Sequence, residues 1–278
     1  MHHTSNMLQE RVLKFLSKKG LRLNTDLGQH YLVSEHVLDA IMRASAVGEK
    51  DTVLEIGPGI GVLTERLLIA AQQVIAVELD GRIIPLLRDF LSEGPAATQL
   101  KKLSLIEGNA LSLQPPNQAY TVVANIPYHI TSPLLRHLFL ESSHTPTSLT
   151  LMIQKEVAET ICDTKSAGLL TILVGLFGTP RMIAHVDPSC FIPAPAVLSA
   201  VIHIDCYQTP KASPPVMQRL FSLTKLAFGQ KRKMLSNTIG SLPEGKKKMD
   251  ESGIEPTRRP QSLTIDEWIR LASSFERQ

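Results

Sequence analysis

Val-Leu-Glu-Ile-Gly-Pro-Gly-Ile-Gly, residues 53–61, is the stretch of this chain that decides its fold. A short apolar run leads into Gly57, Gly59 and Gly61, and a helical pattern follows over 62–71. Glycine is needed where the backbone must approach a ligand closely or adopt a positive φ. A glycine turn between a first parallel strand and a helix is typical of a site for a nucleotide-like cofactor. We therefore predict a strand, a cofactor-binding turn and a helix here.

Alternating strand and helix patterns continue on both sides of this unit. Helices are expected over 7–19 and from Ser34 to Gly48, before the first strand. This alternation predicts an α/β fold with a doubly wound parallel sheet. A segment with one polar side, 197–204, is expected to be an edge strand near the end of the sheet. The other predicted strands are 52–56, 73–78, 103–106, 120–125 and 148–153, with helices over 62–71, 81–92 and 132–140.

The composition changes near residue 210, where a Pro-rich and Ser-containing run covers 208–215. Beyond it the sequence shows helical patterns over 216–228 and 265–275 and no clear strand. We expect one domain over 1–210 and a small helical domain over 211–278. Residues 213–278 carry 12 Lys and Arg against 7 Asp and Glu, whereas residues 1–212 carry 17 against 19. The basic C-terminal part predicts an anionic partner.

Bulk properties exclude several classes of protein. The chain has 278 residues, of which 43% are hydrophobic and 20% are charged, as in a globular protein. The longest apolar stretch, 167–178, has 12 residues and is too short to cross a bilayer. The start, Met-His-His-Thr-Ser-Asn, lacks the features of a secretory signal, so we expect a cytoplasmic protein. Cys162, Cys190 and Cys206 match neither zinc nor disulfide spacing and are expected to be reduced, mostly buried thiols, with no metal site.

The spacing of the glycines distinguishes between two cofactor classes. A dinucleotide turn needs its third glycine at position 62, where this chain has Val62. Glu55, two positions before the first glycine, can receive an ammonium group but would repel a pyrophosphate. The turn therefore favours S-adenosylmethionine. Glu78 ends the next strand, 21 residues after Gly57, where a carboxylate can accept the ribose hydroxyls of either cofactor.

Two more groups follow later strands of the predicted sheet. Asn109 comes after the third strand, where its amide can bind the adenine. Asn125-Ile126-Pro127-Tyr128 follows the fourth strand. The Asn125 oxygen and the Ile126 carbonyl can hold an exocyclic amine with its lone pair toward a methyl donor, which is catalysis by positioning. Pro127 fixes the turn, and Tyr128 can stack on a base; the alternative is a strand-end turn with a buried Tyr.

On these motifs the chain resembles the ribosomal RNA adenine N6,N6-dimethyltransferases, a family that includes small-subunit enzymes and erythromycin-resistance methylases. The last matching block is basic and is similar to the small-subunit (16S) branch. The resemblance covers nearly the whole length and implies a Rossmann-like sheet of the S-adenosylmethionine-dependent methyltransferase kind, followed by a small helical domain. The matching blocks are Leu27–Leu32, Glu55–Gly61, Asn125–Tyr128, Met152–Val157, Cys190–Pro195 and Ala227–Lys233.

The resemblance also implies roles for individual residues. His30, Leu32 and Gly57 would contact the methionine end of the cofactor, Glu78 the ribose and Asn109 the adenine. Phe191 would face Tyr128 across the flipped target base, although a Phe before a Pro-rich loop also fits simple core packing. The chain departs from the family pattern at five positions. Asn is usual at His30, Phe at Tyr31 and Asp at Asn109, and after Pro195 a Lys and an Asp are usual where this chain has Ala196 and Leu198.

Basic residues in the C-terminal part are the expected contacts to RNA phosphates. Lys231, Arg232 and Lys233 match the family's basic block, and Lys225 lies just before it. Lys246–Lys248, Arg258 and Arg259 extend this basic surface, although a solvated face without a ligand is the simpler interpretation of Lys246–Lys248.

Together these patterns predict a cytoplasmic, monomeric enzyme that uses S-adenosylmethionine and releases S-adenosylhomocysteine. As the family resemblance implies, its substrate would be N6 of two adjacent adenosines near the 3′ end of small-subunit (16S) ribosomal RNA, free or in a pre-subunit particle, and its role ribosome biogenesis. No membrane partner is expected. A non-catalytic RNA-binding assembly factor is disfavoured by the intact Asn125–Tyr128 motif, and a nicotinamide oxidoreductase by the glycine spacing. A large-subunit ribosomal RNA methylase is a further alternative.

Overall fold

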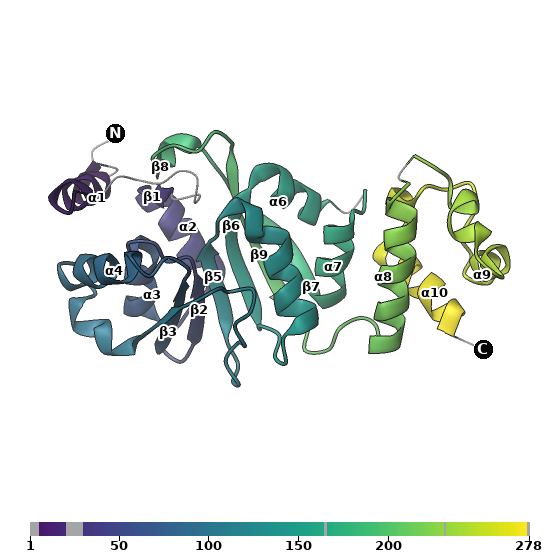
Figure 1. Cartoon of the computed structure of the whole chain (residues 1–278), viewed down its shortest axis with the longest axis horizontal. Coiled ribbons are helices and arrows are strands. Elements are labelled where there is room, and N and C mark those ends of the chain that lie inside the picture. Colours follow the sequence, from purple (N-terminus) through teal and green to yellow (C-terminus); the bar gives the residue numbers. More distant parts are fainter. Residues whose placement is uncertain (1–5, 21–29, 164–165, 231, 277–278) are drawn as a thin grey trace. The chain divides into compact units, whose positions relative to one another are not determined.

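The computed structural model describes residues 6–20, 30–163, 166–230 and 232–276, which form a seven-stranded sheet with helices around it and a group of C-terminal helices (Figure 1). The strand order is β4-β3-β2-β5-β6-β9-β7. Pairing is parallel from β4 to β6, and β9 is antiparallel to β6. The strands are β1 Tyr31–Leu32, β2 Thr52–Ile56, β3 Gln73–Glu78, β4 Leu103–Glu107, β5 Thr121–Asn125, β6 Ser148–Gln154, β7 Gly178–Val186, β8 Phe191–Ile192 and β9 Ser199–Cys206.

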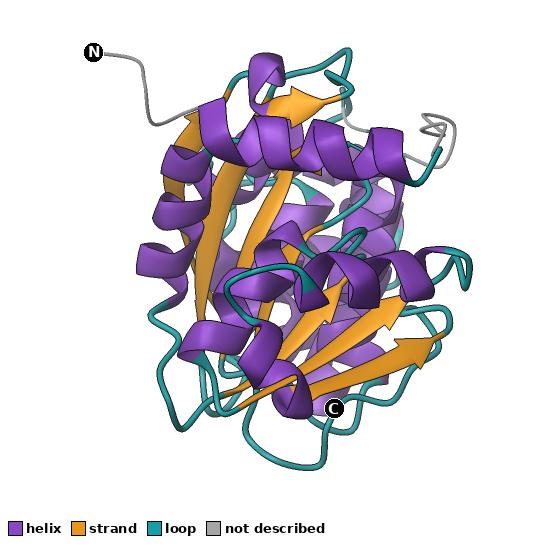
Figure 2. Cartoon of the chain, turned by 90° about the vertical axis from the view of Figure 1, so that its left-hand side faces the viewer, coloured by secondary structure: helices purple, strands orange, loops and turns teal. Residues whose placement is uncertain are grey.

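Helices surround the strands of the sheet (Figure 2). Helix α2 packs on β5, β6 and β9, and α3 packs on β3. None of the helices in the described ranges is both long and apolar enough to cross a membrane. The helices are α1 Asn6–Lys18, α2 Glu35–Ser45, α3 Val62–Ala70, α4 Ile83–Ser92, α5 Thr131–Arg136, α6 Lys155–Cys162, α7 Leu169–Phe177, α8 Pro214–Phe228, α9 Gly245–Glu251 and α10 Ile265–Glu276.

The strand predicted over 197–204 is present as β9, but its predicted place at the sheet edge is wrong. β9 lies between β6 and β7, and β7 was not predicted. The polar side chains of β9 that suggest a solvated edge are satisfied inside the protein. His203 is 4% exposed, and its Nδ1 lies 2.8 Å from the hydroxyl of buried Thr150 on β6. Alternation therefore reflects a buried polar pair here and not contact with water.

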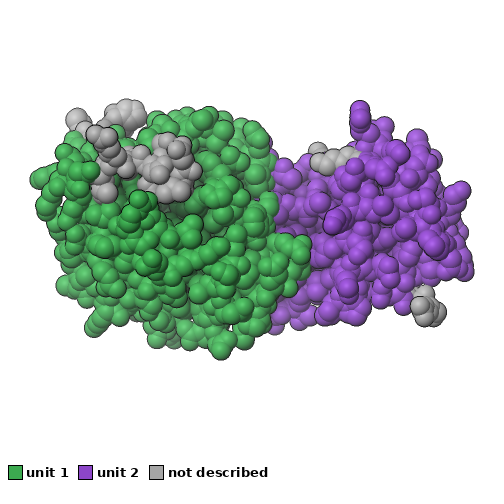
Figure 3. Space-filling view, viewed as in Figure 1, with its two compact units in different colours: residues 1–158, 181–206 green, residues 159–180, 207–278 purple. Residues whose placement is uncertain are grey.

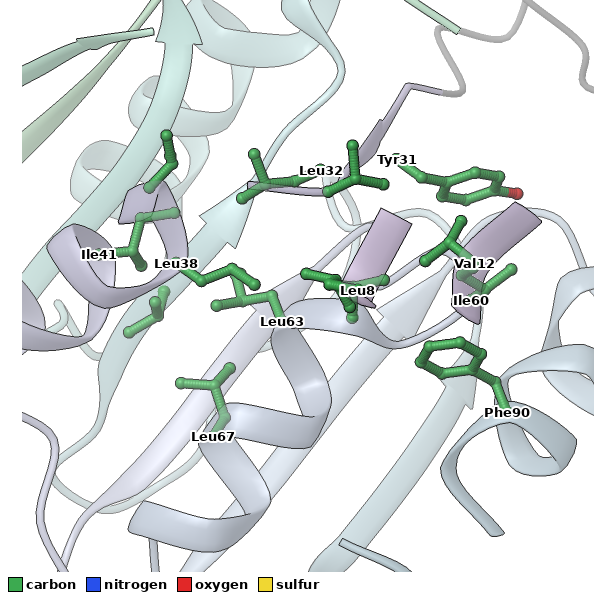
Figure 4. Packing of buried hydrophobic residues seen from close by; sticks show 14 of the residues in the cluster. Leu8, Val12, Tyr31, Leu32, Leu38, Ile41, Ile60, Leu63, Leu67 and Phe90 are labelled. Atoms are coloured by element: carbon green, nitrogen blue, oxygen red, sulfur yellow. The ribbon is translucent and has the colours of Figure 1, made fainter. Parts of the chain in front are cut away.

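A large apolar core lies around α1, α2, α3 and α4 (Figure 4). Helix α1 contributes the face formed by Leu8, Val12, Phe15 and Leu16, all buried. The ring of Phe15 meets that of Phe90 edge-on, with 5.2 Å between the ring centroids. The apolar spacing that predicts this helix is thus the spacing of its buried face. The core holds α1 and α2 against α3 and α4.

A two-stranded antiparallel ladder joins β1 to β8. Tyr31 pairs with Ile192, and Leu32 pairs with Phe191. The contact extends on both sides, since the Val33 N–H donates to the Cys190 carbonyl at 2.8 Å. At the other end, His30 Nδ1 donates to the carbonyl of Pro193 at 2.8 Å. These strands are too short for a sequence pattern, so the ladder could not be predicted.

The contacts divide the chain into two compact units (Figure 3). Unit 1 consists of residues 1–158 and 181–206, and unit 2 consists of 159–180 and 207–278. The change between 206 and 207 lies close to the boundary expected near 210, whereas the inclusion of 159–180 in unit 2 differs from the expected domains. Residues 159–180 belong to unit 2 because they include α7, which packs on α8 and α10. The Tyr207 and Lys211 N–H groups also donate to carbonyls of α7.

The three cysteines are free thiols, as expected, but each is only partly buried.

Candidate active site

A cavity of about 250 Å³ lies in unit 1 where β2, β3, β4 and β5 end. The carboxyl ends of parallel strands meet at one edge of a sheet, and this edge is the usual place for a ligand in such folds. The structure brings together there every residue predicted to bind the cofactor and the whole catalytic motif. These lining residues are His30, Leu32, Glu55, Gly57, Gly59, Glu78, Asn109, Asn125, Ile126, Pro127 and Tyr128.

The glycine turn forms one wall of the cavity. Gly57, Gly59 and Gly61 have φ values of 68°, 57° and 98°, which side chains disfavour. A Cβ at Gly59 would lie 2.9 Å from Cε1 of Tyr31, so any side chain at this position would displace the Tyr31 ring. The Gly59 N–H donates to Glu78 Oε2 at 3.3 Å. The turn therefore holds the carboxylate at the end of β3 as well as shaping the wall.

Two carboxyl groups of the cavity differ in their environments. Glu55 is 1% exposed, its Oε2 has no hydrogen-bond partner among the described residues, and burial raises its pKa to about 8. Burial also raises the pKa of Glu78, although the N–H groups of Gly59 and Asp80 donate to it and oppose the shift. A buried carboxyl group beside a cavity, with one oxygen that has no hydrogen-bond partner among the described residues, suits a cationic group on the ligand.

The catalytic motif begins at the last residue of β5. The Asn125 Nδ2 donates to the carbonyl of His30 at 3.3 Å, which leaves the amide oxygen as the acceptor on the cavity side. Gly57 lies next to the motif, since a Cβ built on it would be 3.4 Å from Cδ of Pro127. The Tyr128 hydroxyl lies 2.6 Å from that of Ser199. The glycine turn and the Asn125–Tyr128 segment are thus neighbours in the cavity wall.

Asn109 lies in the cavity wall with its side-chain oxygen already engaged. Its Oδ1 accepts the Leu111 N–H at 3.0 Å. The amide nitrogen therefore remains as a donor toward a ligand. Apolar side chains that the sequence did not single out, including Leu79 and Ile83, line the same cavity. Nothing in their spacing separates them from ordinary core residues.

Phe191 is 3% exposed and belongs to the apolar core. It pairs in the β1–β8 ladder with Leu32, which lines the cavity, whereas Phe191 itself does not. This burial agrees with the core packing that its sequence context also offered. The place opposite Tyr128 that the resemblance implies for Phe191 stays a prediction.

The basic residues of unit 2 fall into two groups. Lys225, Arg232 and Lys233 are exposed and form no ion pair with a carboxylate in the described ranges. Lys231 lies outside the described residues. Phe228, between these lysines in sequence, is buried beside Trp268 with 6.0 Å between the rings, so it does not offer a stacking surface. The first group is a set of free cations.

The second group is engaged within the protein. Arg258, assigned from sequence to the basic surface, donates to both carboxylate oxygens of Glu267. Lys247 and Lys248 each lie within 4.0 Å of a carboxylate oxygen of Glu251. Arg258 is therefore a structural residue of unit 2, and the simpler interpretation of 246–248 agrees with the ion pairs. In the sequence, the signal for this ion pair was Glu267, nine positions after Arg258.

Comparison with known proteins places these features in a family. A family model described as "Ribosomal RNA adenine dimethylase" matches residues 20–277. The chain is 38% identical over 267 residues to ribosomal RNA small subunit methyltransferase A of Clostridium botulinum, covering 93% of this chain and 96% of the relative. The protein of that name from Alkaliphilus oremlandii is 36% identical, covering 97% of each.

Solved structures agree on the fold. A dimethyladenosine transferase from Plasmodium falciparum superposes with a TM-score of 0.76 at 26% identity, over 89% of this chain and 98% of that one. The 23S rRNA methyltransferase ErmE has a TM-score of 0.71 at 24% identity, over 89% of this chain and 100% of that one, and supports the fold alone. With the model match and the relatives above, the chain belongs to the ribosomal RNA adenine dimethylase family.

Proposed function

We propose that this enzyme transfers methyl groups from S-adenosylmethionine to N6 of two adjacent adenosines in small-subunit ribosomal RNA. One observation carries the proposal: a single cavity joins the cofactor residues to the intact Asn125–Tyr128 motif. The relatives named above as small-subunit methyltransferases support the choice of RNA.

The residues of the cavity fit S-adenosylmethionine. The unpaired Oε2 of buried Glu55 suits the cationic methionine end, together with His30 and Leu32. Glu78 would accept the ribose hydroxyls, and the donor nitrogen of Asn109 suits a ring nitrogen of adenine. When bound, the cofactor supplies an electrophilic methyl group on a sulfonium.

The catalytic motif then acts by orientation. The amine at N6 of adenosine is a weak nucleophile because its lone pair is delocalised into the ring. The free oxygen of Asn125 and the carbonyl of Ile126 would accept its two hydrogens and direct the lone pair at the methyl carbon. Tyr128 would stack on the extruded base. Lys225, Lys231, Arg232 and Lys233 would neutralise phosphates of the same RNA.

The decisive experiment incubates the protein with labelled S-adenosylmethionine and under-methylated small subunits, then maps modified nucleosides by mass spectrometry. We expect dimethyladenosine at two adjacent positions near the 3′ end of the small-subunit RNA. Large subunits, incubated in parallel, should stay unlabelled. Cofactor binding without any dimethyladenosine would instead indicate a non-catalytic assembly factor, and label in large subunits would indicate the alternative RNA.

A further inference from the structure

Tyr128 is held on the cavity wall at two points. It begins a short 3-10 turn, Tyr128–Ile130, which follows β5 and is not part of the sheet. The Thr131 hydroxyl donates to its carbonyl at 3.1 Å and fixes the backbone. Among the described residues, the polar end of the ring has one hydrogen-bond partner: its hydroxyl lies 2.6 Å from that of Ser199.

Ser199 is suited to fix an orientation. It is the first residue of β9, it pairs with Gln154 of β6, and its exposed fraction is 0%. A hydroxyl with no access to water cannot exchange its partner for solvent, so losing the bond leaves an unsatisfied group. Ser199 belongs to a ladder of seven paired residues between β6 and β9, whereas the turn that carries Tyr128 has three residues. The strand therefore positions the ring, and not the reverse.

A second pair of hydroxyls separates this role from simple stabilisation. Thr121 and Ser148 lie at the starts of β5 and β6, at the opposite end of the strands that carry the site, and their hydroxyls are also 2.6 Å apart. Neither lines the cavity. The two hydrogen bonds are chemically alike, but only one of them ends at a residue of the catalytic motif.

We infer that Ser199 is a positioning residue that sets the ring plane of Tyr128 for stacking on the target adenine. The inference rests on the proposed function. Ser199 touches neither cofactor nor base, and it acts through the Tyr128 hydroxyl. A ring free to turn about its χ angles would lose the geometry that orients N6, and small misplacements of this kind are costly to turnover.

The test compares Ser199→Ala with Ser148→Ala, each in the full chain. Three quantities are measured: kcat/KM for methylation of under-methylated small subunits, the Kd of S-adenosylhomocysteine by calorimetry, and the free energy of unfolding in urea. We expect Ser199→Ala to lower kcat/KM by roughly tenfold to a hundredfold while the Kd changes less than about twofold. Ser148→Ala should keep the wild-type rate and lose less stability, because Ser148 is only partly buried and the Thr121 hydroxyl still donates to its carbonyl.

Tyr128→Phe removes the same hydrogen bond from the cavity side and keeps the ring, so it is informative even if Ser199→Ala folds poorly. Its loss should match that of Ser199→Ala, and the double variant should lose no more than either. Equal rates for Ser199→Ala and Ser148→Ala, or additive losses with Tyr128→Phe, would overturn the role of Ser199. An inactive wild-type chain that binds S-adenosylhomocysteine would overturn the proposed function itself.

Discussion

Glu55 makes the stability of the folded protein depend on pH. Its pKa in the folded protein, about 8, lies above the ordinary value of 4.5 because burial penalises the charged form. The folded state thus binds this proton more tightly than the unfolded state does. This contribution makes the cofactor-free protein less stable as pH rises from about 4.5 to about 8.

Glu55→Gln keeps the shape of the side chain and removes the titration. We expect the variant to show a flatter dependence of unfolding free energy on pH between 5 and 8, measured by urea denaturation without cofactor. The wild-type chain should lose stability over the same range relative to the variant. Parallel curves for the two proteins would show that Glu55 does not titrate in this window.

Asn125 tests the division of labour within the cavity. Asn125→Ala removes the acceptor for the amine but leaves the glycine turn, Glu55 and Glu78 intact. We expect the Kd of S-adenosylhomocysteine to change less than about threefold while kcat falls by on the order of a hundredfold or more. Calorimetry and single-turnover methylation measure the two quantities. A comparable loss of both would mean that Asn125 chiefly binds cofactor.

At the scale of single elements, α10 begins with a reciprocal cap. The Glu267 N–H donates to Thr264 Oγ1 at 3.2 Å, and the Thr264 N–H donates to Glu267 Oε2 at 2.8 Å. Arg258 binds the same carboxylate, and its hydrogen bonds lower the pKa of Glu267 to about 2. The cap therefore ties the start of the helix to the loop before it.

Thr264→Ala removes one half of this cap. We expect the free energy of unfolding to fall by about 1 kcal/mol, measured by urea denaturation at neutral pH. Thr257→Ala, an exposed threonine in the same unit, is the matched control and should change stability by less than about 0.5 kcal/mol. Equal effects of the two substitutions would mean that the cap does not stabilise the fold.

Local patterns explain which elements the sequence could predict. The strand over 52–56 and that over 73–78 coincide with β2 and β3 because their apolar runs are set by burial on both faces. Glu78, Asn109 and Asn125 could be predicted to share a site because they end or follow neighbouring parallel strands, which fixes the edge they share. His30 and Leu32 were identified from the family resemblance, and Ser199 was not identified, since its place depends on which distant strand lies beside it. No local pattern of apolar residues contains that information.

At the scale of the whole molecule, α7 is the reason why the two compact units differ from the domains expected from the sequence. It precedes residue 210 but belongs to unit 2. Its side chains Ile172, Val174 and Leu176 are fully buried, and the helix packs on α8 and α10. A chain that ends at residue 210 would keep α7 and lose both partners. We expect this truncated chain to aggregate, because it exposes an apolar helix face. Light scattering beside the full-length protein measures this, and a monodisperse folded fragment would contradict it.

The exposed basic side chains of Lys225, Arg232 and Lys233 in unit 2 lead to a prediction about how salt affects RNA binding. Replacing all three by Gln should weaken binding to small-subunit RNA and reduce the slope of log Kd against log salt by about 2 to 3. The Kd of S-adenosylhomocysteine should stay unchanged. Filter binding at several salt concentrations gives the slope. An unchanged slope would mean that the RNA binds elsewhere.

The ladder between β1 and β8 has a consequence for the order in which the protein matures on the ribosome. Tyr31 lines the cavity and pairs with Ile192. This part of the cavity wall therefore cannot form until β8, which is synthesised much later than β1, has left the ribosome. The part of the cavity at the carboxyl ends of β2, β3 and β5 can form as soon as β5 has left the ribosome. Closing so long a loop is slow compared with local pairing. The nascent chain should therefore acquire its cofactor cavity only near the completion of unit 1, which delays methyl transfer until the enzyme is almost fully made.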